Sequence, residues 1–176
     1  MGQARLTDKT ALAEQTGSGD LFMVVDVSDT AGSPEGTSKK IDSKFIIQTD
    51  KISVSNAELQ ALNSTSKTLV GALSGYMVTP LNVTMLCTYA ASTESSSNNL
   101  YFGYDDSSIG SYWFQIRDVM NGKTTDMSYV QSAYYATGGT CTTSILNKPF
   151  LIWTNAALNG GWTCDIYVTY AYTKIL

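Results

Sequence analysis

Residues 162–172 read Trp-Thr-Cys-Asp-Ile-Tyr-Val-Thr-Tyr-Ala-Tyr, and they are the clearest indication of the fold class. Apolar or aromatic residues occupy every second position from Trp162 to Tyr172, with Thr, Asp, Tyr and, at position 171, Ala between them. A period of two with polar residues on one face is typical of a strand in an antiparallel sheet. The same alternation recurs in residues 83–89 and 112–117. These three segments predict an antiparallel β domain.

Outward from these strands, residues 62–176 consist of short extended segments separated by turn-forming residues. No pattern for a helix of three turns or more is present in this part. Eight or so short strands with Gly- and Asn-rich turns predict a β-sandwich of the jelly-roll type. The further expected strands are residues 68–72, 76–79, 100–104, 129–135 and 150–154.

Charged and aromatic residues divide the chain into two parts. Residues 1–61 hold 6 of the 11 Lys and Arg and 9 of the 15 Asp and Glu, whereas 17 of the 19 aromatic residues lie in residues 62–176. Residues 63–67, Asn-Ser-Thr-Ser-Lys, are a run of turn formers. We therefore expect an N-terminal module of residues 1–61 and a β domain of residues 62–176. The module has few large side chains with which to build a core of its own.

Within the N-terminal module, residues 21–25 (Leu-Phe-Met-Val-Val) predict one buried strand bounded by turns. A second extended segment begins at Lys39, and the two predict a hairpin. Residues 55–58, Ser-Asn-Ala-Glu, match the capping box that begins many helices. They predict a short helix over residues 56–62, just before the boundary.

The composition excludes several classes of function. The chain has no histidine, which excludes Ser-His-Asp and Cys-His catalytic groups and His-ligated metals. Its net charge of −4 argues against a nucleic-acid partner, because phosphate binding needs a basic face. No apolar run approaches the ~20 residues of a membrane span, so we expect no membrane partner. Only 15% of residues are charged, while 42 are Ser or Thr, so we expect a hydroxyl-rich surface.

Three cysteines, Cys87, Cys141 and Cys164, are widely spaced and include no Cys-x-x-Cys pair. We interpret them as reduced thiols that line the core of a protein made in a cytoplasm. A zinc site would need a carboxylate as its fourth ligand, and we expect no metal and no cofactor.

Carboxylates offer little for catalysis in the β domain. Asp105 and Asp106 are adjacent, but they lack the alternating ligands of a calcium loop and predict a solvated turn. Glycosidase chemistry needs two carboxylates facing each other across a cleft, and several of the acids lie in or beside turns. We therefore expect no enzyme activity. The acids considered are Glu94, Asp105, Asp106, Asp118, Asp126 and Asp165.

Tyrosine and tryptophan are too numerous for one small interior. Adjacent aromatic residues on a strand point to opposite faces of the sheet, so one of each pair lies on the outer face. Three interpretations stay open: contact between subunits, a face that stacks on sugars, or scattered exposed tyrosines. The candidates for a subunit interface are Tyr112, Trp113, Tyr134, Tyr135, Tyr167, Tyr170 and Tyr172.

Residues 6–47 resemble a module that recurs in structural proteins of tailed-bacteriophage virions. The stretch Leu-Thr-Asp-Lys-Thr (6–10) is followed by Gly-Asp-Leu-Phe-Met-Val-Val-Asp-Val-Ser-Asp (19–29) and Gly-Thr-Ser-Lys-Lys-Ile (36–41), in the order and spacing of that module. Residues 62–70, which lead into the β domain, are also similar to the corresponding segment of such proteins, with Ser66 in place of their usual proline. The closing strand, residues 162–172, is similar as well.

This resemblance implies a non-enzymatic virion component, a head fibre or capsid decoration protein, assembled in the host cytoplasm. Its partners would be other virion proteins, and it would form a homotrimer. The alternative is a tail-fibre or appendage protein that recognises glycans on the host surface. An exposed strand edge suits the module for docking, because it can pair with a neighbour's sheet. The candidates for virion attachment are Leu6, Asp8, Asp20, Leu21, Phe22, Val24, Asp26, Lys39 and Lys40.

Overall fold

The computed structural model describes residues 21–31, 34, 36–42, 45–104, 112–132 and 145–174. The chain divides into two compact units, residues 1–46 and 47–176. The division falls earlier than the boundary that we expected after residue 61. Strand β3 (Gln48–Val54) and helix α1 (Asn56–Ala61) lie in the second unit, because β3 pairs with the last strand of the β domain.

The first unit contains the expected hairpin. Strands β1 (Leu21–Asp26) and β2 (Thr37–Asp42) pair in antiparallel register from Leu21 opposite Asp42 to Asp26 opposite Thr37. Gly36 ends the connection with a φ of 113°, and a Cβ at this position would lie 2.7 Å from the Asp26 carbonyl oxygen. A glycine is therefore required where the chain enters β2.

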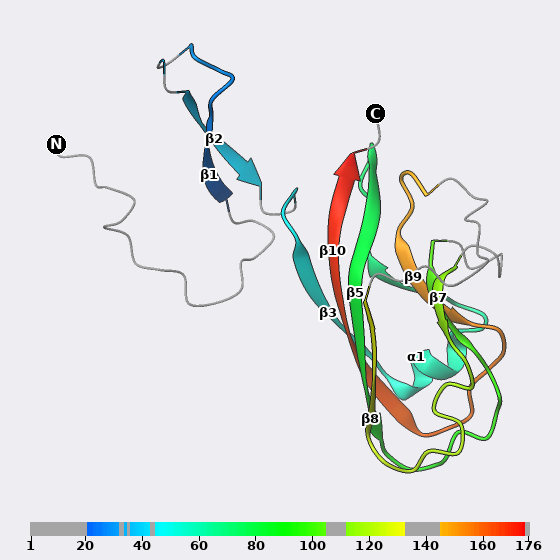
Figure 1. Ribbon diagram of the computed structural model, residues 1–176. Coiled ribbons are helices and arrows are strands. Elements are labelled where there is room, and N and C mark those ends of the chain that lie inside the picture. Colours follow the sequence, from blue (N-terminus) through cyan, green and yellow to red (C-terminus); the bar gives the residue numbers. More distant parts are fainter. Residues whose placement is uncertain are drawn as a thin grey trace. The chain divides into compact units, whose positions relative to one another are not determined.

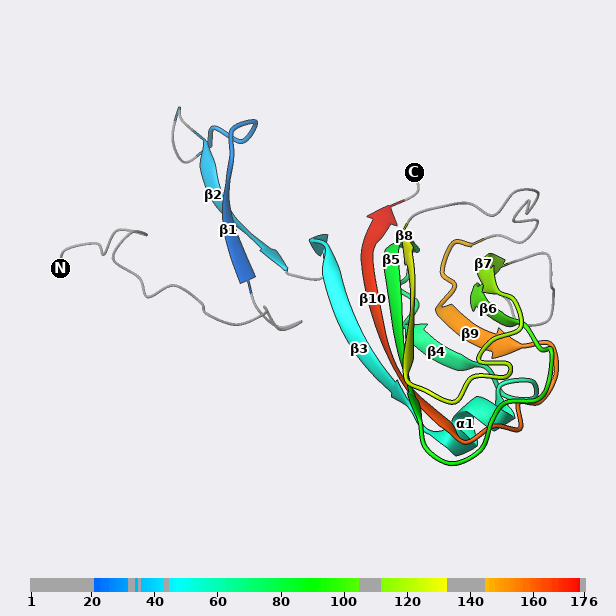
Figure 2. The ribbon, with the colours of Figure 1, turned by 60° about the horizontal axis from the view of Figure 1, so that its bottom comes forward.

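The second unit is a sandwich of two four-stranded antiparallel sheets, in the orders β3-β10-β5-β8 and β4-β9-β6-β7. Figure 2 shows the two layers, with α1 at one end of the sandwich. Successive strands mostly alternate between the sheets, and this order of eight strands is that of a jelly roll. The predicted fold class is therefore confirmed. The remaining strands are β4 (Lys67–Val70), β5 (Tyr76–Tyr89), β6 (Leu100–Gly103), β7 (Tyr112–Ile116), β8 (Met127–Ser132), β9 (Phe150–Thr154) and β10 (Trp162–Lys174).

Strand β10 lies between β3 and β5, as Figure 1 shows, and its alternation builds the core. Its inward side chains are almost completely buried, and they lie beside the inward side chains of β5 on the same face of the sheet. Burial of such side chains provides about 1.5–3 kcal/mol each relative to exposure. The buried β10 residues are Trp162, Cys164, Ile166, Val168 and Tyr170.

A second, smaller cluster lies on the opposite face of the sheet β4-β9-β6-β7. Tyr101, Leu151 and Trp153 are buried there, with Tyr112 packed against them. The neighbouring Trp113 instead packs edge-on against Phe150 in the main core, with ring centroids 5.9 Å apart. Adjacent aromatic residues therefore point to opposite faces, as predicted, and each face of this sheet carries its own aromatic cluster.

Helix α1 begins at the predicted capping box. The Ser55 hydroxyl accepts a hydrogen bond from the Glu58 N–H, and the Glu58 carboxylate accepts one from the Ser55 N–H at 2.8 Å. Leu59 and Leu62 are 1% exposed and fix the helix against the core. Within the described ranges, no helix has the length and apolar character needed to cross a membrane.

Candidate functional site

The hairpin carries the most exposed apolar surface in the described part of the chain. Five apolar side chains of residues 22–27 are exposed, from 37% for Phe22 to 75% for Val27. Successive side chains of a strand point to opposite faces, so both faces of β1 are apolar. The expectation that this strand is buried is therefore wrong: among the described residues, no second layer covers either face of this two-stranded ribbon.

Two predicted attachment residues, Phe22 and Val24, lie on one face of β1. Phe22 also lines an open hollow of about 340 Å³, together with Met23, Ser38, Lys39 and Lys40. The structure thus combines apolar and basic groups on one surface of the hairpin. Leu21 is described as the first residue of β1, whereas Leu6, Asp8 and Asp20 lie outside the described residues.

Charged groups in the hairpin mainly shape its turn. Lys39 forms an ion pair with Asp29, and this contact is the largest cause that lowers the pKa of Asp29. Asp26 accepts hydrogen bonds from the Ser28 hydroxyl at 2.6 Å and the Ser28 N–H at 3.0 Å, which lower its pKa. These carboxylates are accessible to solvent, so their bonds order the turn locally and add little to the stability of the chain.

The outer face of the sheet β3-β10-β5-β8 carries a second exposed patch. Leu86 is 43% exposed and Val130 is 65% exposed. Thr84 lies opposite Tyr167 on one neighbouring strand and opposite Val130 on the other. Leu86 is two residues along β5 from Thr84, so these side chains share one face. We call Leu86, Val130 and Tyr167 the outer patch.

The ring of Tyr167 already has a partner within the chain. The Lys51 ammonium lies 5.9 Å from the ring centroid and 2.9 Å from the Asp165 carboxylate. A sugar stacking on this ring would have to compete with Lys51 for the same face.

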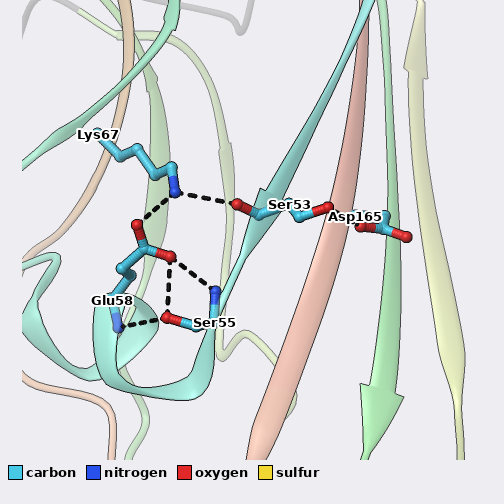
Figure 3. Close-up of polar contacts among 5 residues, drawn as sticks. All are labelled: Ser53, Ser55, Glu58, Lys67 and Asp165. Carbon is cyan, nitrogen blue, oxygen red and sulfur yellow. Dashed lines mark hydrogen bonds and ion pairs between the residues drawn. The ribbon is translucent and has the colours of Figure 1, made fainter.

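Beside the outer patch, a polar cluster joins the end of β3 to α1 and β4 (Figure 3). The Lys67 ammonium donates to the Glu58 carboxylate at 2.5 Å and to the Ser53 carbonyl oxygen at 2.9 Å. These bonds and those from Ser55 lower the pKa of Glu58 to about 2. The Ser53 hydroxyl donates to Asp165 at 2.6 Å, so one short strand segment connects both carboxylates.

An open groove of about 510 Å³ lies over this cluster, with Glu58 and Asp165 in its lining. A glycosidase acid needs a raised pKa so that it holds a proton at neutral pH. Here the pKa values of both Glu58 and Asp165 are lowered, first by Lys67 and Lys51 respectively. The pair therefore acts as hydrogen-bond and ion-pair acceptors that fasten β3, α1 and β10.

Glu94 is the site residue whose role the sequence did not reveal. It is 0% exposed, and its carboxylate accepts bonds from the Asn159 N–H and the Gly160 N–H at 2.8 Å each. The Ser96 N–H donates to the other oxygen at 2.9 Å, as does the Ser96 hydroxyl. Burial raises the pKa of Glu94, but these bonds outweigh it and lower the pKa overall. The carboxylate of Glu94 therefore ties its own loop to the loop of Asn159 and Gly160.

Other predicted interface residues make contacts within the chain. The Tyr170 hydroxyl donates to Asp50 at 2.9 Å, and burial followed by this bond raises the pKa of Tyr170. The Tyr172 hydroxyl donates to the Gly71 carbonyl oxygen at 2.8 Å. Tyr112 and Trp113 belong to the two aromatic clusters described above. Tyr134 and Tyr135 lie outside the described residues.

Cysteine and acidic residues form no group of three or more that is suited to a metal ion in the described part of the chain. Cys87 and Cys164 are buried free thiols that line the core, as predicted. Cys141, Asp105 and Asp106 lie outside the described residues.

No protein-family model and no curated protein matches the chain. The solved structures similar to it include a chain of the capsid asymmetric unit of cyanophage Pam1, with a TM-score of 0.38, 14% identity, and coverage of 98% of this chain and 99% of that chain. The PRD1 vertex protein P5 has a TM-score of 0.38 and 15% identity, covering 90% of this chain and 85% of that chain. A chain in the native virion of Kashmir bee virus has a TM-score of 0.33 and 10% identity, covering 96% and 95%. The assignment of the fold rests on the strand order given above.

Proposed function

We propose that the chain is a non-enzymatic structural component of a bacteriophage virion, a head fibre or capsid decoration protein. The hairpin of residues 21–42 docks onto another virion protein, and the jelly roll of residues 47–176 projects from the particle as a homotrimer. The resemblance of residues 6–47 to the attachment module of such proteins supports this proposal.

The observation that carries the proposal is the uncovered apolar strand β1. Met23 and Val25 are 64% and 60% exposed on one face, and Phe22 and Val24 are 37% and 44% exposed on the other. An isolated two-stranded hairpin is marginally stable in water at best. Burying these side chains against a partner provides about 25 cal/mol per Å² of apolar area and stabilises the hairpin at the same time.

The chemistry of the partner surface follows from the hairpin. The partner offers an apolar groove or an open sheet edge. In the described residues, β1 presents apolar side chains and pairs with β2 along one edge, which leaves its other edge available. Acidic groups at its rim would complement Lys40, which lies opposite the exposed Met23, whereas Lys39 already pairs with Asp29. Such rim charges chiefly steer and orient the encounter.

For the homotrimer, the outer patch is the surface that we propose as the subunit contact. Leu86, Val130 and Tyr167 place aliphatic and aromatic area on one face around Thr84, with Thr88, Ser128 and Asp165 at its margin. Large apolar side chains within a polar rim are the usual composition of a protein interface. Closed symmetric assemblies bury such a patch in every copy.

The test of the attachment is incorporation into particles. In a phage that encodes the chain, Val24→Asp places a carboxylate on the apolar face of β1, and Val24→Ile is the matched control that keeps it apolar. We expect Val24→Asp to lower the copies per purified particle about tenfold or more, because the interface would bury an unpaired charge. Val24 is exposed in the free chain, so the thermal midpoint of the jelly roll stays unchanged.

Normal incorporation of Val24→Asp, together with normal incorporation of a chain that lacks residues 1–46, would contradict the attachment. Binding of the full chain to host glycans on an array, lost on Tyr167→Ala while Val24→Asp still binds, would instead support the receptor-binding alternative. No release of reducing ends from host polysaccharide is expected in either case.

A further inference from the structure

Cys87 and Cys164 stand directly opposite each other on the two longest strands of the sandwich. They are partners in the register of β5 and β10, although 77 residues separate them in the chain. The two sulfur atoms are 3.1 Å apart, in hydrogen-bond contact. Both side chains point into the core, where they are 2% and 3% exposed. The fold therefore holds two thiols in mutual contact between the two central strands of a sheet.

The backbone at this pair suits a covalent link. Directly opposite residues of antiparallel strands have Cα atoms about 4.5–5.5 Å apart. A disulfide needs Cα atoms about 4.4–6.8 Å apart, so the two ranges overlap. The pair lies two positions from one end of the β5–β10 ladder, between the Met85–Ile166 and Tyr89–Trp162 pairs. Closing the sulfur–sulfur bond requires adjustment of the side chains and leaves the strand register intact.

We propose that Cys87 and Cys164 form a disulfide that locks β5 to β10 when the chain folds or transiently opens in an oxidising medium. The oxidant is a low-molecular-weight disulfide such as oxidised glutathione. One cysteine thiolate attacks it, forming a mixed disulfide and releasing one glutathione as its thiolate. The second cysteine thiolate then displaces the second glutathione. Two thiol protons are released to solvent and taken up by the two glutathione thiolates, so the two electrons end on glutathione.

The surroundings of the pair make this reaction depend on opening of the structure. The hydrogen bond between the thiols and their burial both raise the pKa of Cys164, so little thiolate is present in the closed fold. Reaction therefore follows a local opening that admits the oxidant. In a reducing cytoplasm the pair stays as thiols, and the link forms after exposure to an oxidising medium. The inference does not depend on the proposed virion role.

The experiment uses the full-length chain with Cys141→Ser, which removes the third cysteine as a competing partner. The protein is taken through unfolding and refolding in a buffer of oxidised and reduced glutathione, then blocked with an alkylating reagent and digested. We expect mass spectrometry to find a peptide pair joined through Cys87 and Cys164 with the loss of two hydrogen atoms. We also expect the oxidised protein to melt higher than the reduced protein by on the order of 10 °C, because the link closes a long loop.

The matched controls are Cys87→Ala and Cys164→Ala, each in the same background. Each leaves a single thiol, so the oxidant should no longer raise the thermal midpoint. The proposal is overturned if both cysteines of the parent protein remain alkylatable after refolding in the oxidising buffer. It is equally overturned if each carries a separate glutathione and no joined peptide pair forms.

Discussion

Glu94 fixes the end of the sandwich where three loops meet. Its carboxylate binds Ser96, Asn159 and Gly160, and its carbonyl oxygen accepts a bond from the Gly122 N–H at 2.8 Å. A buried carboxylate is tolerated only when its oxygens are well bonded, and four donors meet that need here. The same residue type in a cleft would suggest catalysis, but this arrangement serves the packing of loops.

Gly160 packs tightly against the loop of Glu94. A Cβ at Gly160 would lie 2.7 Å from Cδ1 of Trp162 and 2.8 Å from the backbone nitrogen of Glu94. Gly160→Ala therefore forces the loop away from Glu94, and we expect it to lower the free energy of unfolding by about 2 kcal/mol or more. Denaturant unfolding measures the change.

Gly71→Ala is the matched control for Gly160→Ala. A Cβ at Gly71 meets nothing within 4 Å, so we expect a change within about 1 kcal/mol. Equal effects of the two substitutions would show that the loop around Glu94 is not tightly packed.

Glu58 gives a second prediction, on pH. Its folded pKa is about 2, held there first by Lys67 and then by Ser55, against about 4.3 in an unfolded chain. A lowered pKa means that the unfolded state binds more protons in acid. The stabilising contribution of Glu58 is therefore complete above about pH 4.3 and is lost as the pH falls toward 2.

NMR titration of the Glu58 carboxyl checks this value. We expect a midpoint near 2 in the native chain and a midpoint closer to 4.3 in Lys67→Met, which removes the main cause. Lys51→Met is the control, because Lys51 pairs with Asp165 and should leave the Glu58 midpoint unchanged. An ordinary Glu58 midpoint in the native chain would contradict the contact with Lys67.

The strands and the helix that could be predicted from the sequence are those whose pattern of apolar residues reflects burial of one face. The strand β10 and the capped helix α1 follow from a period of two and from Ser55 and Glu58. The strand β3 was not predicted, because Gln48–Val54 is mostly polar. As an edge strand of its sheet, it needs to bury only a few of its side chains.

Two further differences have physical causes. Residues 76–79 and 83–89 were predicted as separate strands, but they form the single strand β5, which continues through Pro80. The partner β8 pairs with Asn82–Cys87, so Pro80 lies beyond that pairing, where its missing N–H removes no bond to β8. Glu94 is fixed by Asn159 and Gly160, which are 65 and 66 positions further along the chain. Local sequence patterns do not reveal such distant contacts.

The second unit is expected to fold without the hairpin. Its core clusters consist of residues between 54 and 170, so the hairpin supplies none of them. We therefore expect a chain of residues 47–176 to fold, with a thermal midpoint within about 3 °C of the full chain. Differential scanning calorimetry measures both. A truncated chain that fails to give a cooperative transition would show that the N-terminal unit is part of the folding unit.

We expect the chain to assemble into a trimer that is held together by the outer patch. The chain has a mass of 19.0 kDa, so light scattering should give about three times that value in solution. Val130→Asp introduces a charge into the patch at a side chain that is 65% exposed in the free chain. We expect this variant to stay folded and become monomeric, because a buried unpaired charge strongly weakens an interface.

Lys123→Asp is the control for Val130→Asp, since it changes an exposed residue away from the patch and should leave the trimer intact. A native chain that is monomeric at every concentration would contradict the subunit contact, while the attachment through the hairpin would remain to be judged separately. The aromatic count alone did not locate this patch, because most of the described tyrosines are engaged within the chain.

Attachment through the hairpin is best examined in a reconstruction of the intact phage particle by electron cryomicroscopy. We expect density for the jelly roll that projects from the particle around a threefold axis. We also expect β1, with Phe22 and Val24, to be buried against another virion protein. The proposed attachment would be wrong if the chain were absent from the particle, or if β1 faced solvent while other residues made the attachment.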